Sequence, residues 1–341
     1  MTRKTTLKDV AKACGVSTAL VSYALNDKGS KCRVSEEMVK LIKAKAAEMD
    51  YQPNNVAVSL RSGTTRTIGI ILSDISNRFF ADIARCIEDC ASKDGYTVII
   101  GSTDENPEKM NSLIDVFVRR GVDGLIIVPC MGTETKVSAL LDRKIPIVLM
   151  DRDLYGLSVS SVTLDNMKAM SLAVSEFIRQ GVEKIGLISF NTDFSNICDR
   201  EQGYRKAMTD AGLEDNIYVR NASNNRNVYD EMETLMAQVM EDGVRAVIFS
   251  TNRLAIDSLR VLMKMKMRVP DDLALMAFDG SETFAFELYP TSISYVKQPM
   301  EEFGLNAYEI LMESIRMKDI PKSVKKVLEP SLVCRESSQI R

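Results

Sequence analysis

Apolar residues in the first fifty positions recur three and four residues apart, which is the spacing of short amphipathic helices. Leu7, Val10 and Ala11 form the apolar stripe of a first helix. Gly15 is expected to end this helix, and Ser17 is the expected cap of a second. The second helix has an expected buried face of Leu20, Val21 and Ala24. A third helix is expected over 36–49, with a buried face of Val39, Ile42, Ala46 and Met49. Helical proteins of many kinds share this spacing, but two short helices joined by a glycine turn are also the geometry of a helix-turn-helix.

From Thr67 onward, short apolar runs alternate with longer amphipathic stretches, which predicts buried parallel strands alternating with helices. The expected helices are 79–93, 107–120, 135–143, 166–180, 197–211, 228–241, 254–266 and 300–316. The expected strands are Ile68–Leu72, Val98–Ile100, Leu125–Val128, Ile145–Leu149, Ser161–Leu164, Ile185–Ser189, 217–220, Ala246–Phe249, Leu273–Phe278, Ile293–Val296 and Val327–Cys334. The predicted fold class is therefore α/β: a three-helix head, then two doubly wound halves with a cleft between them.

Charge divides the chain of 341 residues at the same point as the pattern does. Residues 1–63 contain eleven Lys or Arg and six Asp or Glu, a net charge of +5, whereas the remainder carries −8. A basic head on an acidic body fits a module that meets DNA phosphates and a body that does not. No run approaches the ~20 apolar residues of a membrane span, and the first residues form no apolar signal core, so we expect a cytoplasmic protein.

The residue inventory argues against several kinds of chemistry. The chain has no histidine, which removes Ser-His-Asp and Cys-His catalysis and the commonest metal ligand. Its seven cysteines form no CxxC pair, and no glycine-rich nucleotide motif follows a predicted strand. We therefore expect no metal, no cofactor and no enzymatic activity.

The stretch L-K-D-V-A-K-A-C-G-V-S-T-A-L-V-S-Y-A-L-N closely resembles the start of the lactose-repressor (LacI/GalR) family of bacterial transcription regulators. The resemblance continues through Tyr51-Gln52-Pro53-Asn54 to Leu60 and then along the rest of the chain. It implies a hinge helix after the head and a body like that of periplasmic sugar-binding proteins, in which the chain crosses between lobes about three times. It also implies a homodimer on a near-palindromic double-stranded DNA operator and a small-molecule effector in the cleft.

The resemblance places the DNA contacts at the start of the second helix and in the hinge. Tyr23 stands where the family commonly has arginine, and tyrosine cannot pair with guanine in the bidentate way of an arginine, so we expect a different operator sequence. Leu60 matches the leucine that wedges into the central base step. Lys4 is a further candidate for a phosphate contact. The predicted DNA-binding residues are Thr6, Leu7, Ser17, Thr18, Ala19, Ser22, Tyr23, Asn26, Lys31, Tyr51, Asn54, Ala57 and Leu60.

Ligands of doubly wound sheets lie beyond the carboxyl ends of the strands, so we searched for polar and aromatic residues there. Asp151, Arg200 and Asp279 match family positions that hold the effector, whereas Arg253 replaces a family aspartate and Arg78 departs from the family pattern. These arginines and the segment D-R-E-Q-G-Y-R, which is similar to fructose-responsive members, favour a sugar or a sugar phosphate. The predicted effector-binding residues are Ser73, Asn77, Phe79, Phe80, Asp151, Arg152, Arg200, Asn252 and Asp279.

Two alternatives use the same body. A solute-binding protein for transport would need an export signal and would have no use for a basic head. A sugar-modifying enzyme would use Asp151 and Asp279 as a carboxylate pair.

The tail after Cys334 has no heptads, so we expect no tetramer built on a C-terminal coiled coil. The predicted domains are a helix-turn-helix (1–50), a hinge helix and linker (51–63) and an effector-binding and dimerisation domain (64–341) with an N-lobe of 64–163 and 296–322 and a C-lobe of 164–295 and 323–336.

Overall fold

The computed structural model describes residues 5–25, 34–52, 63–224, 228–279, 286, 288–317 and 323–340. The chain separates into two compact units, Met1–Thr65 and Arg66–Arg341, which we call the head and the body.

The three helices of the head begin and end where their capping residues stand. They are α1 (Leu7–Cys14), α2 (Thr18–Leu25) and α3 (Glu36–Glu48). Gly15 ends α1 with a φ of 66°, a left-handed conformation that glycine adopts without a steric penalty. The Ser17 hydroxyl accepts a hydrogen bond from the Leu20 amide at the start of α2. Val10, Val21 and Ile42 are fully buried where the three helices meet, so the predicted head is confirmed in its helices and its core.

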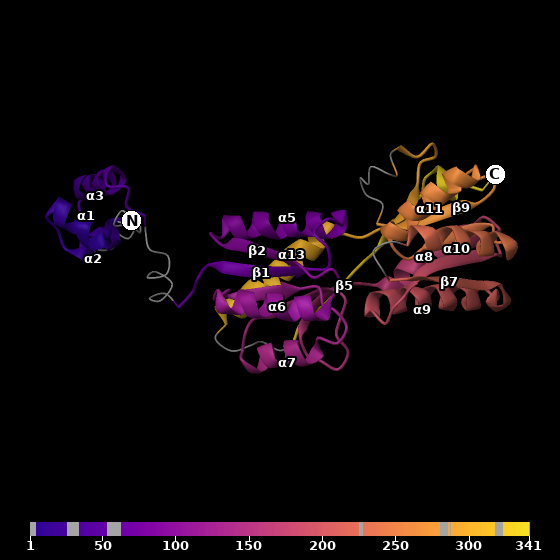
Figure 1. Ribbon diagram of the computed structural model, residues 1–341, viewed down its shortest axis with the longest axis horizontal. Helices are drawn as coiled ribbons and strands as arrows, with labels where there is room; N and C mark the ends of the chain where they lie inside the picture. Colours follow the sequence, from indigo (N-terminus) through magenta and orange to yellow (C-terminus); the bar gives the residue numbers. More distant parts are fainter. Residues whose placement is uncertain are drawn as a thin grey trace. The chain divides into compact units, whose positions relative to one another are not determined.

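The body contains two six-stranded sheets, each of which belongs to one lobe (Figure 1). The first sheet has the order β11-β5-β4-β3-β1-β2, and the second has the order β12-β10-β9-β8-β6-β7. Both sheets are parallel except for the antiparallel pair of β10 and β12. The first sheet consists of β1 (Thr67–Leu72), β2 (Thr97–Ser102), β3 (Gly124–Ile127), β4 (Ile147–Asp151), β5 (Ser160–Leu164) and β11 (Lys325–Leu328). The second consists of β6 (Ile185–Asn191), β7 (Ile217–Ser223), β8 (Ala246–Phe249), β9 (Ala274–Phe278), β10 (Ser294–Lys297) and β12 (Ser331–Val333).

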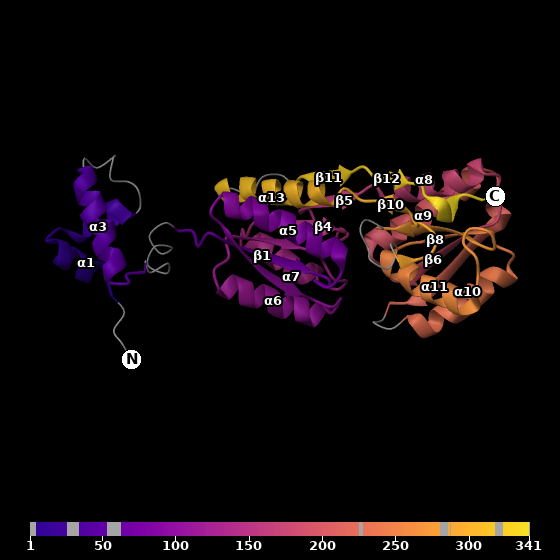
Figure 2. The same cartoon turned by 90° about the horizontal axis from the view of Figure 1, so that it is seen from above.

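Helices cover both faces of each sheet, as the doubly wound pattern predicts. In the first lobe, α5 (Arg78–Lys93) and α13 (Met300–Arg316) lie on one face, and α6 (Pro107–Arg119) and α7 (Glu134–Asp142) lie on the other (Figure 2). The second lobe has α8 (Asn166–Arg179) and α9 (Ser195–Asp210) on one face and α10 (Tyr229–Glu241) and α11 (Asn252–Met265) on the other. A Cβ atom at Gly203 would lie 2.6 Å from the Met167 carbonyl oxygen, so glycine is what lets α8 and α9 pack so closely.

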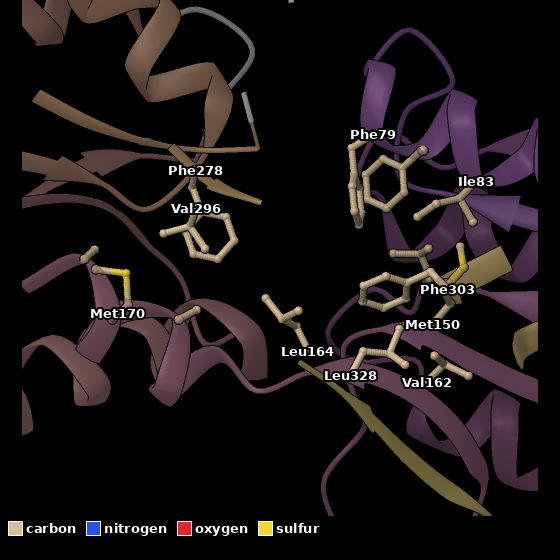
Figure 3. Packing of buried hydrophobic residues seen from close by; sticks show 14 of the residues in the cluster. Phe79, Ile83, Met150, Val162, Leu164, Met170, Phe278, Val296, Phe303 and Leu328 are labelled. Atoms are coloured by element: carbon tan, nitrogen blue, oxygen red, sulfur yellow. The ribbon is translucent and has the colours of Figure 1, made fainter. Parts of the chain in front are cut away.

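One hydrophobic cluster extends through both lobes and joins them (Figure 3). Phe79 and Phe303 pack edge to face in the first lobe, with ring centroids 5.8 Å apart. Leu164 and Leu328 are paired at the ends of β5 and β11, where the chain leaves the first sheet. The crossings between the lobes follow β5, β10 and β11, which matches the expected number of three.

Two expectations about the strands are wrong. The single strand expected over Val327–Cys334 is two strands in different sheets, because β11 pairs with β5 and β12 pairs with β10. Residues 325–328 therefore belong to the sheet of the first lobe, although the predicted C-lobe included 323–336. The strand at 98–100 is not buried either: β2 forms the edge of the first sheet, and Ile100 is 42% exposed. An edge strand has a neighbouring strand on one side only, and an apolar run in the sequence does not distinguish such a strand from a fully buried central one.

Candidate functional site

The head presents the first turn of α2 to solvent. Ser17, Thr18 and Ala19 are exposed there, and Tyr23, one turn further on, is 43% exposed. Ser22 is half-buried on the same helix. The predicted groove-facing positions of α2 are thus accessible on one helix.

Three other residues from the predicted DNA-binding set contribute to the architecture of the head. The Thr6 hydroxyl accepts a hydrogen bond from the Asp9 amide and donates one to the Asp9 carboxylate, which together cap α1. Leu7 and Tyr51 are half-buried and pack against the head core, and burial raises the pKa of Tyr51. The remaining predicted residues, Asn26, Lys31, Asn54, Ala57 and Leu60, lie outside the described residues, as do Lys4 and the hinge helix expected over 56–61.

A cavity of about 490 Å³ lies between the lobes of the body, a volume typical of small-molecule sites. Residues from the carboxyl ends of strands in both sheets line it, as expected for a doubly wound fold. The structure brings all nine predicted effector-binding residues to this one cavity, namely Ser73, Asn77, Phe79, Phe80, Asp151, Arg152, Arg200, Asn252 and Asp279.

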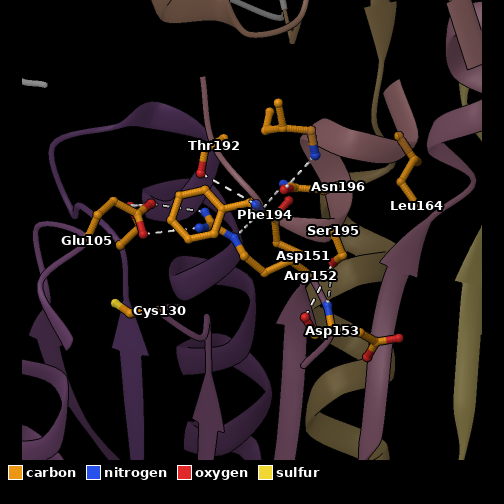
Figure 4. Close-up of polar contacts among 12 residues, drawn as sticks. Glu105, Cys130, Asp151, Arg152, Asp153, Leu164, Thr192, Phe194, Ser195 and Asn196 are labelled. Carbon is orange, nitrogen blue, oxygen red and sulfur yellow. Dashed lines mark hydrogen bonds and ion pairs between the residues drawn. The ribbon is translucent and has the colours of Figure 1, made fainter. Parts of the chain in front are cut away.

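In the first lobe, the guanidinium of the buried Arg152 contacts two carboxylates and one aromatic ring (Figure 4). Its two terminal nitrogens donate to the two carboxylate oxygens of Glu105, each at 3.0 Å, and Nε donates to Asp151 at 3.2 Å. The guanidinium carbon lies 4.0 Å from the ring centroid of Phe194. Ser73 donates a further hydrogen bond to Glu105 at 2.5 Å. Burial alone would lower the pKa of Arg152, but the charges of Glu105 and Asp151 outweigh that effect and raise it. We call Arg152, Glu105 and Ser73 the clamp.

Hydrogen bonds also join the two lobes across the cavity. Asn196 of α9 donates to the Asp151 carboxylate at 2.9 Å, and the Asp153 amide donates to the Ser195 hydroxyl at 3.0 Å. Asn252 donates to the side-chain oxygen of Asn77 at 3.3 Å. A molecule that competes for these groups therefore changes how the lobes are held together.

In the second lobe, Arg200 and Asp279 face the same cavity. Arg200 donates to the side-chain oxygen of Asn166 at 2.8 Å and to the Ser250 carbonyl at 2.7 Å, and its guanidinium lies 3.6 Å from the Phe278 ring centroid. Burial lowers the pKa of Arg200. Burial also raises the pKa of Asp279 to about 7, against the opposing effects of Arg200 and of the hydrogen bond from Gln298. The second lobe thus holds a carboxyl group that titrates near neutrality.

Several lining residues are not among those predicted from the sequence, although the sequence contains a signal for some of them. Glu105 follows β2 by three residues. Phe194 and Asn196 follow β6, which extends to Asn191 rather than to Ser189. Gln298 directly follows β10. Each of these residues follows the carboxyl end of a strand, which is the signal that could have identified it.

The described residues contain no group of three or more Cys, Asp or Glu side chains that could hold a metal ion. Among the helices of the same residues, none is long and apolar enough to cross a membrane.

Comparison with known proteins agrees with this geometry. Residues 6–54 match the family model "Bacterial regulatory proteins, lacI family", and residues 174–338 match the periplasmic binding protein-like domain. The HTH-type transcriptional repressor PurR of Photobacterium profundum is 30% identical over 343 residues, which cover 97% of this chain and 98% of that protein.

Solved structures share the fold at lower identity. The lac repressor dimer bound to operator and the anti-inducer ONPF has a TM-score of 0.83 at 20% identity and covers 98% of this chain and 99% of that one. The transcriptional regulator CelR in complex with cellobiose has a TM-score of 0.69 at 24% identity and covers 98% of this chain and 100% of that one.

The relative that is 30% identical spans nearly the whole chain, and the two family models match the head and part of the body. These matches decide against a transport protein and against the sugar-modifying enzyme. The chain belongs to the LacI family of bacterial transcription regulators.

Proposed function

We propose that this regulator is a repressor that binds a near-palindromic operator as a homodimer and that a sugar or sugar phosphate in the cavity between the lobes controls its operator affinity. The observation that carries the proposal is the gathering of nine independently predicted residues around one cavity in a chain with a helix-turn-helix head.

The head supports the DNA side of the proposal. Thr18, Ala19 and Tyr23 lie on the exposed side of α2 and would meet base edges in the major groove. Ser17 and Ser22 would contact phosphates, which position the helix without reading sequence. The net charge of +5 on residues 1–63 supplies the attraction for the DNA backbone. Such a protein would act on bacterial DNA in the cytoplasm.

The dimer is proposed from the symmetry of operators and from the lac repressor, whose similar structure is a dimer on its operator. Two heads related by a two-fold axis read two half-sites about one helical turn apart, or a multiple of that.

The cavity supports the effector side. It offers carboxylates for hydroxyl groups at Asp151 and Asp279 and aromatic surface at Phe79 and Phe80. The similar CelR structure holds cellobiose. A sugar that forms a hydrogen bond with Asp151 or Asn252 would compete with the bonds that join the lobes. The resulting difference in affinity between two lobe arrangements is commonly worth ~1–3 kcal/mol, which is enough to change operator occupancy.

The test is operator binding by the full-length protein on DNA from the neighbourhood of its own gene, with and without a panel of sugars and sugar phosphates. We expect a protected near-palindrome, affinity that falls steeply with salt, and one ligand that changes the affinity by a factor of roughly 5–150. Absence of a protected site under every condition would contradict the proposal.

Arg200→Ala separates the two activities. Because Arg200 lies in the body and is buried at the cavity, we expect this variant to bind operator but to lose the response to the active ligand. Arg205→Ala on the same helix is the matched control, since Arg205 is exposed and pairs with Glu201. An unchanged response in Arg200→Ala would remove Arg200 from the effector site.

A further inference from the structure

Among the residues that the structure describes, five arginines line the cavity, and side chains or carbonyls of the body already engage four of them. Arg152 donates to Glu105 and Asp151, and Arg200 donates to Asn166 and to the Ser250 carbonyl. Arg78 forms an ion pair with Asp82, and Arg260 forms one with Asp257. These four guanidinium groups therefore already have carboxylate or neutral hydrogen-bond acceptors before any effector binds.

Arg253 differs from these four. Its Nε and Nη2 atoms are buried, and neither has a hydrogen-bond partner among the described residues. The guanidinium lies 4.8 Å from the ring centroid of Phe190, a face that offers no hydrogen-bond acceptor of the ordinary kind. Asp257 stands one turn further along α11, but it forms an ion pair with Arg260 at 3.4 Å. Unpaired buried N–H groups of a cation are costly, so a site that keeps them needs a reason.

The two unpaired nitrogens form one edge of the guanidinium, and the same edge binds carboxylates elsewhere in this protein. Arg85 uses Nε and Nη2 to hold the two oxygens of Asp89, at 3.1 and 2.7 Å. Arg268 does the same with Asp272, at 3.2 and 2.6 Å. This edge matches two oxygens of a carboxylate or a phosphate. Arg253 lines the cavity, but its Nε and Nη2 edge is shielded from solvent and has no carboxylate partner among the described residues.

A second unpaired atom indicates what else the effector carries. Gln298 donates its amide to Asp279, which leaves the buried Gln298 Oε1 without a partner among the described residues. Oε1 is an acceptor only, so it requires a donor such as a hydroxyl group. In the described part of the chain, the cavity lining thus combines two unpaired N–H groups of a cation with one unpaired acceptor.

We propose that the effector is a hydroxylated acid whose carboxylate or phosphate group binds the Nε and Nη2 edge of Arg253. This inference rests on the proposed function, because it names the chemical class of the ligand in the same cavity. Both nitrogens are shielded from solvent, so the Arg253 side chain turns toward the ligand as it binds. The binding free energy then includes two hydrogen bonds that the described residues do not supply, whereas a neutral sugar leaves these bonds unmade.

The experiment compares matched ligands on the full-length protein by thermal shift and calorimetry. Each set contains a neutral pentose or hexose, its aldonic or uronic acid, and its phosphate, for example D-glucose, D-gluconate, D-glucuronate and D-glucose 6-phosphate. We expect an anionic member to raise the melting temperature more than its neutral parent does. The carboxylate and phosphate arms identify which anion the site prefers.

Two variants test the role of Arg253 itself. Arg253→Met keeps the apolar stem beside Phe190 but removes the charge, so we expect at least about tenfold weaker binding of the acid and little change for the neutral sugar. We also expect a higher melting temperature for the ligand-free variant, because it lacks the two buried N–H groups that have no partner among the described residues. Arg268→Met removes a surface arginine that has a partner, and we expect the affinity for the acid to stay unchanged.

Three outcomes would overturn the inference: neutral parents that bind as well as their acids, acid binding that survives Arg253→Met, or a ligand-free Arg253→Met protein that melts lower than the original. The last outcome would mean that the Arg253 side chain stabilises the folded protein. A neutral sugar that releases operator DNA would overturn the claim that the effector is an acid, but it would leave the proposed function standing. Absence of a protected operator would instead count against the proposed function, whatever the ligand panel gives.

Discussion

Asp151 and Asp279 occupy equivalent places in the two lobes, but their surroundings differ. Each follows or ends the third strand in its sheet order, β4 and β9, and each has a left-handed backbone with φ of 71° and 58°. Asp151 accepts hydrogen bonds from Arg152 and from Asn196 of the other lobe. Asp279 accepts a hydrogen bond from the neutral Gln298.

The difference shows how one architecture can give two walls of a cavity opposite properties. The first lobe carries its charges already paired, in the clamp and in Asp151. The second lobe keeps a carboxyl group with a pKa of about 7 and an arginine whose Nε and Nη2 have no partner among the described residues. A doubly wound sheet determines where these groups stand, whereas the neighbouring side chains decide whether they are satisfied by the protein or left for a ligand.

The largest effect should come from removing the ionisable group of Asp279. A carboxyl whose pKa is raised on folding favours the folded state while it is protonated. Its contribution is therefore present below the unfolded pKa of 3.8 and is lost as pH rises to about 7. We expect Asp279→Asn to flatten this part of the stability profile and to be the more stable protein at pH 8. A rise of about three pKa units bounds the difference at about 4 kcal/mol.

Asp272→Asn is the control with the opposite sign. Hydrogen bonds from Arg268 lower the pKa of Asp272 to about 2, so this group stabilises the protein above its unfolded pKa and loses that effect as pH falls through about 2. Urea unfolding followed by circular dichroism from pH 2 to 8 measures both variants, because this range covers the pKa of Asp272 as well as that of Asp279. A profile of Asp279→Asn that runs parallel to that of the original protein would contradict the contrast between the two carboxyl groups.

A smaller effect is expected from breaking the clamp. Glu105→Ala leaves the buried Arg152 with Asp151 alone and also removes the partner of Ser73. Because Glu105 is 26% exposed, we expect a loss of about 2–3 kcal/mol in the free energy of unfolding, less than for a fully buried pair. Asp82→Asn breaks the exposed pair with Arg78 and should cost about 0.5 kcal/mol or less. Equal losses in the two variants would show that the clamp is no stronger than a surface ion pair.

The smallest effect concerns the hydrogen bond between the lobes at Asn252. Asn252→Ala removes one bond of 3.3 Å to Asn77, so we expect a loss of about 0.5 kcal/mol in the free energy of unfolding. Asn77→Ala removes that bond and also the cap at the Phe79 amide, and we expect a further loss of about 1 kcal/mol. Denaturant midpoints compare the two. A larger loss in Asn252→Ala than in Asn77→Ala would contradict this assignment of the contacts.

Much of the fold could be predicted because local chemistry decides it. Thr6, Gly15 and Ser17 begin or end helices through bonds to residues three or four positions away, so their roles are visible in the sequence. Buried parallel strands read as apolar runs whatever their neighbours are. The division of 325–333 into β11 and β12 could not be predicted, because pairing with β5 or β10 depends on residues more than thirty positions away.

The candidate site divides in the same way. The sequence placed Asp151 and Asp279 at the ends of strands and Arg200 on a helix that follows another strand, and the parallel topology then brought them to one cavity. It did not reveal that Glu105 satisfies Arg152, that Asp279 loses its solvation, or that Arg253 keeps an unpaired edge. Periodicity and turn chemistry act over a few residues and are written in the chain. Pairing and desolvation are properties of groups that meet only when distant segments pack, so only the tertiary structure decides them.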